Sequence, residues 1–320
     1  MSDDPIPDAS PLHRVCVFSP LPMLTITVEP HGEDDYRVHI HAGGQGVWVA
    51  RMVCTMEVQA HLVGCFGGET GLVATSLVRS EGIELTPVDM STDTPSYVHD
   101  RRGGDREIMV EPMFPALERH ALDELYTAAL GAGLGADVAV LTGVPVSNAI
   151  EDDTYRRLAS DLRSNGQRVV ADLHGAQLCA ALEAGLTLLK ISDEELQEDG
   201  LLKPKDVANV NKVVAAGIEL RNRGAEEVVI SRSSEPAVVS IDGEWFTVHG
   251  PDMQVVDYRG AGDSMTAALA VGLAKGLSRS DTIRLATAAG SLNVTRHGLA
   301  TGRPETIREI ADRVDLRPIG

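Results

Sequence analysis

Short apolar runs alternate with segments of helical periodicity along most of this 320-residue chain. The runs have the length and composition of buried strands, and the segments between them repeat apolar residues every three or four positions, as amphipathic helices do. The runs are residues 13–19, 58–67, 137–144, 167–173, 184–191, 226–231 and 237–241, and the helical segments include 69–82, 153–166, 204–224 and 304–314. Because right-handed β-α-β units give this alternation, we expect a three-layer α/β/α sandwich around a mostly parallel, Rossmann-like sheet.

Two segments break the alternation, at about residues 25–42 and 86–115. The second contains two alternating runs around Gly103 and Gly104, which is the pattern of a β-hairpin. We expect these segments to form a small β lid on a single kinase-sized domain of residues 13–320, preceded by a disordered tail of residues 1–12. A lid with an open edge and an apolar face predicts a homodimer in which two lids pair.

Charge and cysteine spacing exclude several classes of function. A formal net charge of -19 argues against a broad basic face for nucleic acid or for an anionic membrane. No apolar stretch of 18 residues is present, and the four cysteines are far apart without a CxxC pair. We therefore expect a cytoplasmic protein with reduced thiols, a small-molecule ligand, and no nucleic-acid or membrane partner.

The sequence GAGD, residues 260–263, precedes an alanine-rich helical stretch. A glycine turn before a helix presents unpaired amide hydrogens at the positive end of the helix dipole, where an anion or a developing negative charge is stabilised. Asp263 at that position could accept the proton of a hydroxyl that attacks phosphorus. The alternative is structural, with Asp263 or Ser264 capping the helix and the glycines only making the turn.

Two signatures, in their order and separation, resemble those of the ribokinase-like, or phosphofructokinase-B-type, carbohydrate kinases. They are GGQGVWVA at residues 43–50 and DYRGAGD at residues 257–263, with KISDEEL at residues 190–196 between them resembling a third family segment. The resemblance is strongest to the 1-phosphofructokinase and tagatose-6-phosphate kinase branch. It implies an enzyme that moves the γ-phosphoryl group of ATP, with Mg²⁺, to an alcohol group of a small carbohydrate-like substrate.

The family pattern assigns roles to individual residues. Asp263 corresponds to the catalytic base, the amides of Gly260, Ala261 and Gly262 to the anion hole, and Glu195 to a group that positions Mg²⁺ through water, although a solvated helix start is the alternative for Glu195. The nucleotide-side positions are Lys190, Ser192, Glu195, Ser231, Arg259, Asn293 and Gly298, and the substrate-side positions are Met23, Gly43, Gly44, Gln45, Trp48, Tyr97 and Asp263.

Several substrate-side positions depart from the family pattern. Gln45 replaces a lysine, Trp48 an asparagine, Met23 an aspartate, and Pro95 an arginine that grips a sugar phosphate. Losing a bidentate cation weakens phosphate recognition. We therefore expect a substrate that is less charged and carries a flat or apolar part. The alternative is a weakly catalytic or inactive relative that serves as a ligand-binding or regulatory protein.

Overall fold

The computed structural model describes residues 13–32, 35–104, 106–144, 146, 148–233, 235–296 and 299–320. The expected tail, residues 1–12, and the predicted nucleotide-side residue Gly298 lie outside these ranges.

Within the described residues, a ten-stranded sheet forms the middle layer, in the order β14-β13-β12-β11-β10-β9-β8-β1-β4-β5. The strands from β11 to β5 run parallel, and β12, β13 and β14 extend the sheet in antiparallel pairs. Each apolar run predicted as a strand contains one. The bounds are β1 Arg14–Phe18, β4 Gln59–Phe66, β5 Glu84–Asp89, β8 Val138–Thr142, β9 Arg168–Asp172, β10 Leu186–Ser192, β11 Ala225–Arg232, β12 Glu235–Ile241, β13 Glu244–His249 and β14 Asp315–Pro318.

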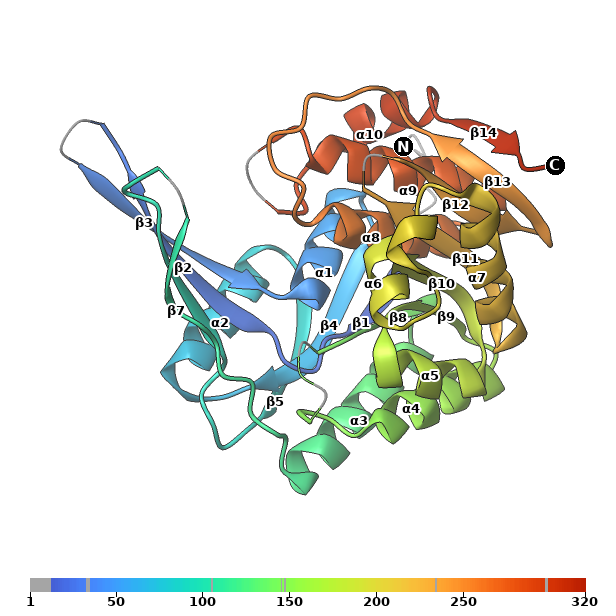
Figure 1. Ribbon diagram of the computed structural model, residues 1–320. Helices are drawn as coiled ribbons and strands as arrows, with labels where there is room; N and C mark the ends of the chain where they lie inside the picture. The colour runs from blue at the N-terminus through green and yellow to red at the C-terminus, as the bar shows by residue number, and fades with distance from the viewer. Residues whose placement is uncertain are drawn as a thin grey trace, which may run out of the picture.

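Helices cover both faces of this sheet (Figure 1). Alternate residues of β1 show the two cores, because Val15 and Val17 pack into one and Cys16 and Phe18 into the other. The predicted three-layer sandwich is confirmed. The first core takes α1 Gln45–Thr55, α2 Gly68–Ser80, α8 Ala261–Ala274, α9 Arg279–Asn293 and α10 Pro304–Ala311, and the second takes α3 Arg119–Leu134, α4 Asp152–Ser164, α5 Gly175–Ala184, α6 Asp193–Glu198 and α7 Val210–Asn222. None of the helices in the described ranges is long and apolar enough to cross a membrane.

A second sheet, in the order β3-β2-β6-β7, projects from the body as the lid (Figure 1). Its strands are β2 Met23–Pro30, β3 Tyr36–Gly43, β6 Ser96–Asp100 and β7 Glu107–Val110. The pair β6 and β7 is the predicted hairpin, and Gly104 in its turn has a φ of 95°, which favours glycine. The predicted lid range is wrong at residues 86–89, since these belong to β5, which pairs in parallel with β4 in the central sheet.

The two faces of the lid differ in polarity. Val38 and Ile40 of β3 lie opposite Val28 and Ile26 of β2 on one face, and both remain exposed, by 60% and 43%. The opposite face carries threonine and histidine side chains of the same two strands, including Thr25 and its partner His41. One lid face is therefore apolar and only partly covered by the chain itself.

Candidate active site

The GAGD segment begins helix α8. Gly260 is the N-cap, with a φ of 75° in the left-handed region, so a residue with a side chain would be strained there. No side chain forms a cap hydrogen bond at this helix start. The Ser264 hydroxyl does not accept from an amide of the first turn and instead donates its hydrogen to the Gly260 carbonyl at 2.7 Å. The structure therefore excludes Ser264 as the capping residue, and the catalytic role of Asp263 stays a prediction.

Asp263 is partly buried in the first turn of α8. Burial raises the pKa of its carboxyl to about 7; the carboxylates of Asp172 and Glu195 act in the same direction, while the Lys190 ammonium opposes them. A carboxyl with this pKa exists in both protonation states near neutral pH. That is the property required of a general base that takes up a proton and later releases it.

A buried ion pair lies under the start of α8. Lys190 and Asp172 are register partners on adjacent strands β10 and β9, and Lys190 Nζ lies 3.1 Å from Asp172 Oδ1. Thr266 of α8 donates its hydroxyl hydrogen to Asp172 Oδ2 at 2.6 Å. The pair is almost inaccessible, with side-chain exposures of 7% for Lys190 and 1% for Asp172. This cluster joins helix α8 to the carboxyl ends of two central strands.

For each partner of this pair, burial shifts the pKa in one direction and the opposite charge of the other partner shifts it back. Burial raises the pKa of Asp172, while the ammonium of Lys190 and the hydroxyl of Thr266 act against that rise. Burial lowers the pKa of Lys190, but Asp172, Glu195 and Asp263 together raise it. Because each oxygen of the Asp172 carboxyl accepts a hydrogen bond, the geometry favours the ionised pair.

The ammonium of Lys190 lies close to Gly262. A Cβ on Gly262 would lie 2.8 Å from Lys190 Nζ and 3.4 Å from its Cε. The absence of a side chain at this position lets the ammonium approach the backbone of the GAGD turn, at the helix end where anions are favoured. Lys190 was predicted as a nucleotide-side residue, and the structure places it beneath the loop and paired with Asp172.

Glu195 and Ser192 form a capping box at the start of α6. Glu195 Oε2 accepts from the Ser192 amide at 2.7 Å and from the Ser192 hydroxyl at 2.8 Å. Burial raises the pKa of Glu195, but Lys190 and the bonds from Ser192 lower it by more, so the carboxyl is ionised at neutral pH. Ser231, also predicted on the nucleotide side, is the register partner of Ser192 on β11.

The donor set fits Mg²⁺ held through water. Among the residues that the structure describes, no group of three or more His, Cys, Asp or Glu side chains is arranged to hold a metal ion directly. Mg²⁺ in phosphoryl-transfer sites keeps several waters and uses one or two carboxylates together with the substrate phosphates. The ionised carboxyl of Glu195, in the first turn of α6 directly after β10, suits that arrangement.

The remaining nucleotide-side residues, Asn293 and Arg259, form hydrogen bonds and an ion pair that hold the loop before α8. Asn293, which is 1% exposed, donates to the Arg259 carbonyl at 2.6 Å and accepts from the Ala300 amide at 2.8 Å. Arg259 pairs through its guanidinium with Asp257 in the same loop. Their predicted contact with nucleotide stays a prediction, and their observed partners are within the protein.

Four of the substrate-side residues lie at the start of α1 or directly before it: Gly43, Gly44, Gln45 and Trp48. Gly44 is the N-cap with a φ of 99°, and Gln45 is the first helical residue. Gln45 accepts from the Gly143 amide at 3.0 Å through Oε1 and donates to the Asp172 carbonyl at 3.4 Å through Nε2. Its amide therefore connects the ends of β8 and β9.

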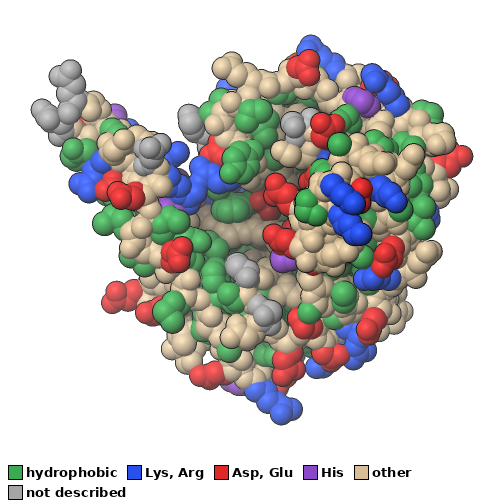
Figure 2. Space-filling view, viewed as in Figure 1, with side chains coloured by type: hydrophobic (Ala, Val, Ile, Leu, Met, Phe, Trp, Pro, Cys, Tyr) green, Lys and Arg blue, Asp and Glu red, His purple; other side chains and the backbone are tan. Residues whose placement is uncertain are grey.

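Met23 and Trp48 flank Gly43 at the base of the lid. A Cβ on Gly43 would lie 3.6 Å from Met23 Cγ and 3.8 Å from Trp48 Cζ2, and 3.1 Å from the Thr25 hydroxyl oxygen. Met23 is buried and Trp48 packs partly against the first core. The structure thus brings the predicted apolar replacements together at the point where the lid joins the body. Figure 2 shows a hollow between the lid and the body in this view.

The lid contributes an aromatic pair. The ring of Tyr97 stacks on that of His99, with centroids 5.1 Å apart and planes 17° apart. The guanidinium of Arg106 bonds with His99 Nε2. Of the other arginines that flank the hairpin turn, Arg101 pairs with Glu29 at 3.1 Å, and Arg102 pairs with Asp100 at 2.6 Å. Tyr258, another aromatic residue near the signature, is 77% exposed.

Helices α1 and α8 lie side by side and start at the same end. Near their starts, Gln45 and Thr266 both bond with Asp172, and near their ends Lys275 of α8 donates to the Met56 carbonyl of α1 at 2.9 Å. The helices are therefore parallel, and both N-termini face the site.

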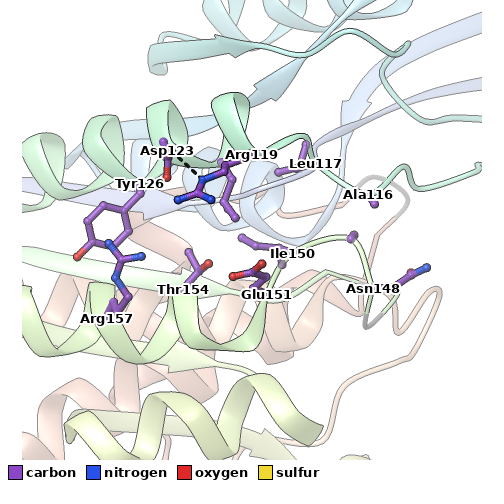
Figure 3. Close-up of a pocket in the computed structure, with 12 residues that line it drawn as sticks. Ala116, Leu117, Arg119, Asp123, Tyr126, Asn148, Ile150, Glu151, Thr154 and Arg157 are labelled. Carbon is purple, nitrogen blue, oxygen red and sulfur yellow. Dashed lines mark ion pairs between the residues drawn. The ribbon is translucent and has the colours of Figure 1, made fainter.

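A cavity of about 430 Å³ lies elsewhere, between α3 and α4. Figure 3 shows Arg119, Asp123 and Tyr126 of α3 facing Glu151, Thr154 and Arg157 at the start of α4. Exposed side chains of both charges line it, and it shares none of its lining residues with the site around Asp263. Nothing in its chemistry matches phosphoryl transfer.

Sequence reasoning missed Asp172 and Thr266. Asp172 was included in a predicted strand, 167–173, as one polar residue at its end. The available signal was its position: a single carboxylate that ends the apolar run Val169–Ala171 lies where the carboxyl ends of parallel strands meet. Thr266 gave no signal, since a threonine within an alanine-rich helix is unremarkable in sequence.

Comparisons with known proteins bear on the family and the fold of this chain. A family model described as pfkB family carbohydrate kinase matches residues 24–306. The 1-phosphofructokinase of Bacillus subtilis (strain 168) is 27% identical over 294 residues, covering 87% of this chain and 94% of that protein. The ATP-dependent 6-phosphofructokinase isozyme 2 of Mycobacterium tuberculosis (strain ATCC 25618 / H37Rv) is 30% identical over 264 residues, covering 81% and 75%. The crystal structure of phosphofructokinase-2 from Escherichia coli in complex with potassium aligns with a TM-score of 0.80 at 25% identity, covering 94% of this chain and 98% of that one.

Proposed function

The chain belongs to the pfkB family of carbohydrate kinases, and on this premise we propose that it transfers the γ-phosphoryl group of ATP to an alcohol group of a small carbohydrate-like compound. The observation that supports this best is Asp263, a carboxyl with a pKa of about 7 in the first turn of a helix whose N-cap is Gly260. A base and a set of amide donors are thereby placed at one helix end.

In the proposed reaction, the substrate hydroxyl oxygen attacks the γ-phosphorus and the bond to the β-phosphate oxygen breaks, so that ADP leaves. The hydroxyl proton passes to the carboxylate of Asp263. The amides of Gly260 and Gly262 face the negative charge of the phosphoryl group, whereas the Ala261 amide donates to the Tyr258 carbonyl at 3.4 Å. Mg²⁺, held through water by Glu195, would neutralise phosphate charge when bound.

We further propose that the acceptor is less charged than a sugar phosphate. A phosphate group needs cationic donors in fixed geometry, and the first signature offers Gln45, whose amide is bonded to two backbone groups. Arg101 and Arg102 of the lid are each paired with an acid. Trp48 provides a flat surface beside Gly43, which suits an apolar or planar part of a substrate.

The transfer reaction is tested by ADP release in the presence of Mg-ATP and a panel of sugars, sugar alcohols, nucleosides and sugar phosphates. Asp263→Asn should reduce turnover by about 10²-fold or more with ATP binding retained. Asp312→Asn, at an exposed residue after α10, is the control and should keep full turnover. Release of ADP at equal rates by wild type and Asp263→Asn would remove Asp263 from the mechanism. No acceptor-dependent release by the wild type would favour the binding or regulatory alternative.

The substrate proposal is tested by comparing fructose 1-phosphate, fructose 6-phosphate and tagatose 6-phosphate with uncharged acceptors. We expect the three sugar phosphates to be poor substrates. If any is phosphorylated with a kcat/KM near about 10⁴ M⁻¹s⁻¹ or above, the proposal is wrong. Arg106, whose guanidinium bonds to His99 and, among the described residues, to no carboxylate, is then the first residue to replace.

We also propose that two lids pair in a homodimer through their apolar faces. The exposed side chains of Val38 and Ile40, with Val110 on β7 exposed by 49%, form a surface that a second copy would cover. Val38→Asp should convert a dimer into a monomer at micromolar concentration, measured by sedimentation. Leu72→Asp, at a 72% exposed residue of α2 in the body, is the control and should leave the dimer intact.

A further inference from the structure

We propose that the buried pair of Asp172 and Lys190 is a positioning device for Asp263, which fixes the start of α8 and sets the charge that Asp263 carries at neutral pH. The proposal deepens the proposed function and rests on it, since it assigns regulation of the base to two residues that do not touch the acceptor.

The geometry ties the pair to the catalytic turn from two sides. On the helix side, Thr266 lies one helical turn after Asp263 and donates its hydroxyl hydrogen to Asp172 at 2.6 Å. On the sheet side, Lys190 Nζ occupies the space that a side chain at Gly262 would need, at 2.8 Å from the position of its Cβ. A movement of either charge therefore moves the first turn of α8.

The charges around Asp263 come from three elements. Asp172 on β9 and Glu195 on α6 disfavour its ionised form, and Lys190 on β10 favours it. Glu195 accepts bonds from Ser192 and stays ionised, so its contribution is nearly constant across neutral pH. The balance at Asp263 is thus set by Asp172 and Lys190, which act with opposite signs.

Stability alone does not account for this pair. Taking an ammonium and a carboxylate out of water costs free energy that their attraction only partly returns, and well-packed apolar side chains of similar volume often stabilise a core equally well or better. A charged pair that is 7% and 1% exposed, directly below a loop built to hold anions, has an electrostatic role that apolar residues could not fill.

The test measures the titration of Asp263 in the free protein, without nucleotide or acceptor. The carboxyl carbons of aspartate are labelled with ¹³C, and the Asp263 signal is identified by its loss in Asp263→Asn. Asp172→Asn should move the titration midpoint to lower pH, and Lys190→Met should move it to higher pH, each by about one pH unit or more. Glu227→Gln removes a buried carboxylate on β11 that bonds with Ser240, and it should leave the midpoint unchanged.

Opposite movements in the two variants support the proposal, because a purely structural loss would not reverse sign with the charge removed. Movement in the same direction, or no movement, overturns it. If one of the two variants does not fold, the other still tests the proposal, because the direction in which the Asp263 midpoint should move is predicted for each variant separately. The wild type supplies a further measurement: the ¹⁵Nζ signal of Lys190 should show an inflection at the midpoint of Asp263 that disappears in Asp263→Asn. A flat Lys190 signal through that range also overturns the proposal.

These measurements separate this proposal from the proposed function. A protein without kinase activity but with the predicted midpoints refutes the function and retains the electrostatic assignment. In an active enzyme, the acidic limb of the kcat/KM profile should follow the same order: lowest pH for Asp172→Asn, then wild type, then Lys190→Met. If activity is present and this order is not observed, the positioning role is refuted while the transfer reaction stands.

Discussion

The raised pKa of Asp263 predicts that removing its charge stabilises the protein in alkaline solution. In the unfolded chain this carboxyl ionises near its ordinary pKa of 3.8, and in the folded protein near about 7. Between these values the folded protein binds a proton that the unfolded chain has lost. The stability of the fold therefore falls as pH rises through this window, and the loss is complete above pH 7.

The size of the effect follows from the difference between the two pKa values. About three pH units at about 1.4 kcal/mol each give an upper estimate of about 4 kcal/mol. Asparagine cannot ionise, so Asp263→Asn lacks this loss. The variant should match the wild type near pH 4 and exceed it by up to about 4 kcal/mol at pH 8, while its turnover is reduced.

The assay is urea unfolding followed by circular dichroism at several pH values from 5 to 8, for the wild type and Asp263→Asn. Contributions of titrating groups that do not interact with Asp263 are common to both proteins and cancel in the difference. Asp312→Asn, at an exposed carboxyl, should follow the wild type at every pH. The reasoning is refuted if the difference between Asp263→Asn and the wild type is constant with pH, or if it shrinks as pH rises.

Three further substitutions test the packing of the site. Gly262→Ala would place a methyl group 2.8 Å from Lys190 Nζ, so we expect turnover to fall by more than about 10-fold. The control is Gly131→Ala in α3, where the space around the Cβ is open, and this variant should stabilise the helix by up to about 1 kcal/mol. Asn293→Ala leaves a backbone carbonyl and a backbone amide without their partner, and thermal unfolding should report a loss of about 1–3 kcal/mol. Gln45→Leu removes the acceptor of one amide and the donor of one carbonyl, and the same measurement should show a loss of similar size.

The fold could be predicted because its signals are local. Apolar runs such as residues 137–144 and 167–173 match β8 and β9, and the Gly-Gly hairpin of the lid is where turn chemistry placed it. The extent of the lid was misjudged at residues 86–89. Pro87 lies in an edge strand, β5, where a missing amide hydrogen can be tolerated.

The site could be predicted only where a backbone turn marks it. Gly260 and Asp263 are visible in sequence because a glycine turn, a carboxylate and a helix adjoin one another. The pair of Asp172 and Lys190 is separated by 18 residues and is formed by register between two strands, which no local pattern contains. Likewise, the observed partners of Asn293 and Gln45 are backbone groups that come close only after the layers pack.

The parallel arrangement of α1 and α8 has an energetic consequence for the resting protein. Each helix carries a partial positive charge of about half an elementary charge at its N-terminus, and the two starts lie together with Gly44 and Gly260 as their caps. Like charges held side by side repel, and an anion bound between the two helix starts relieves that repulsion, as the carboxylate of Asp263 in the first turn of α8 does in part. Binding of a phosphate-bearing ligand should therefore stabilise the folded protein and raise its melting temperature before any bond is made or broken.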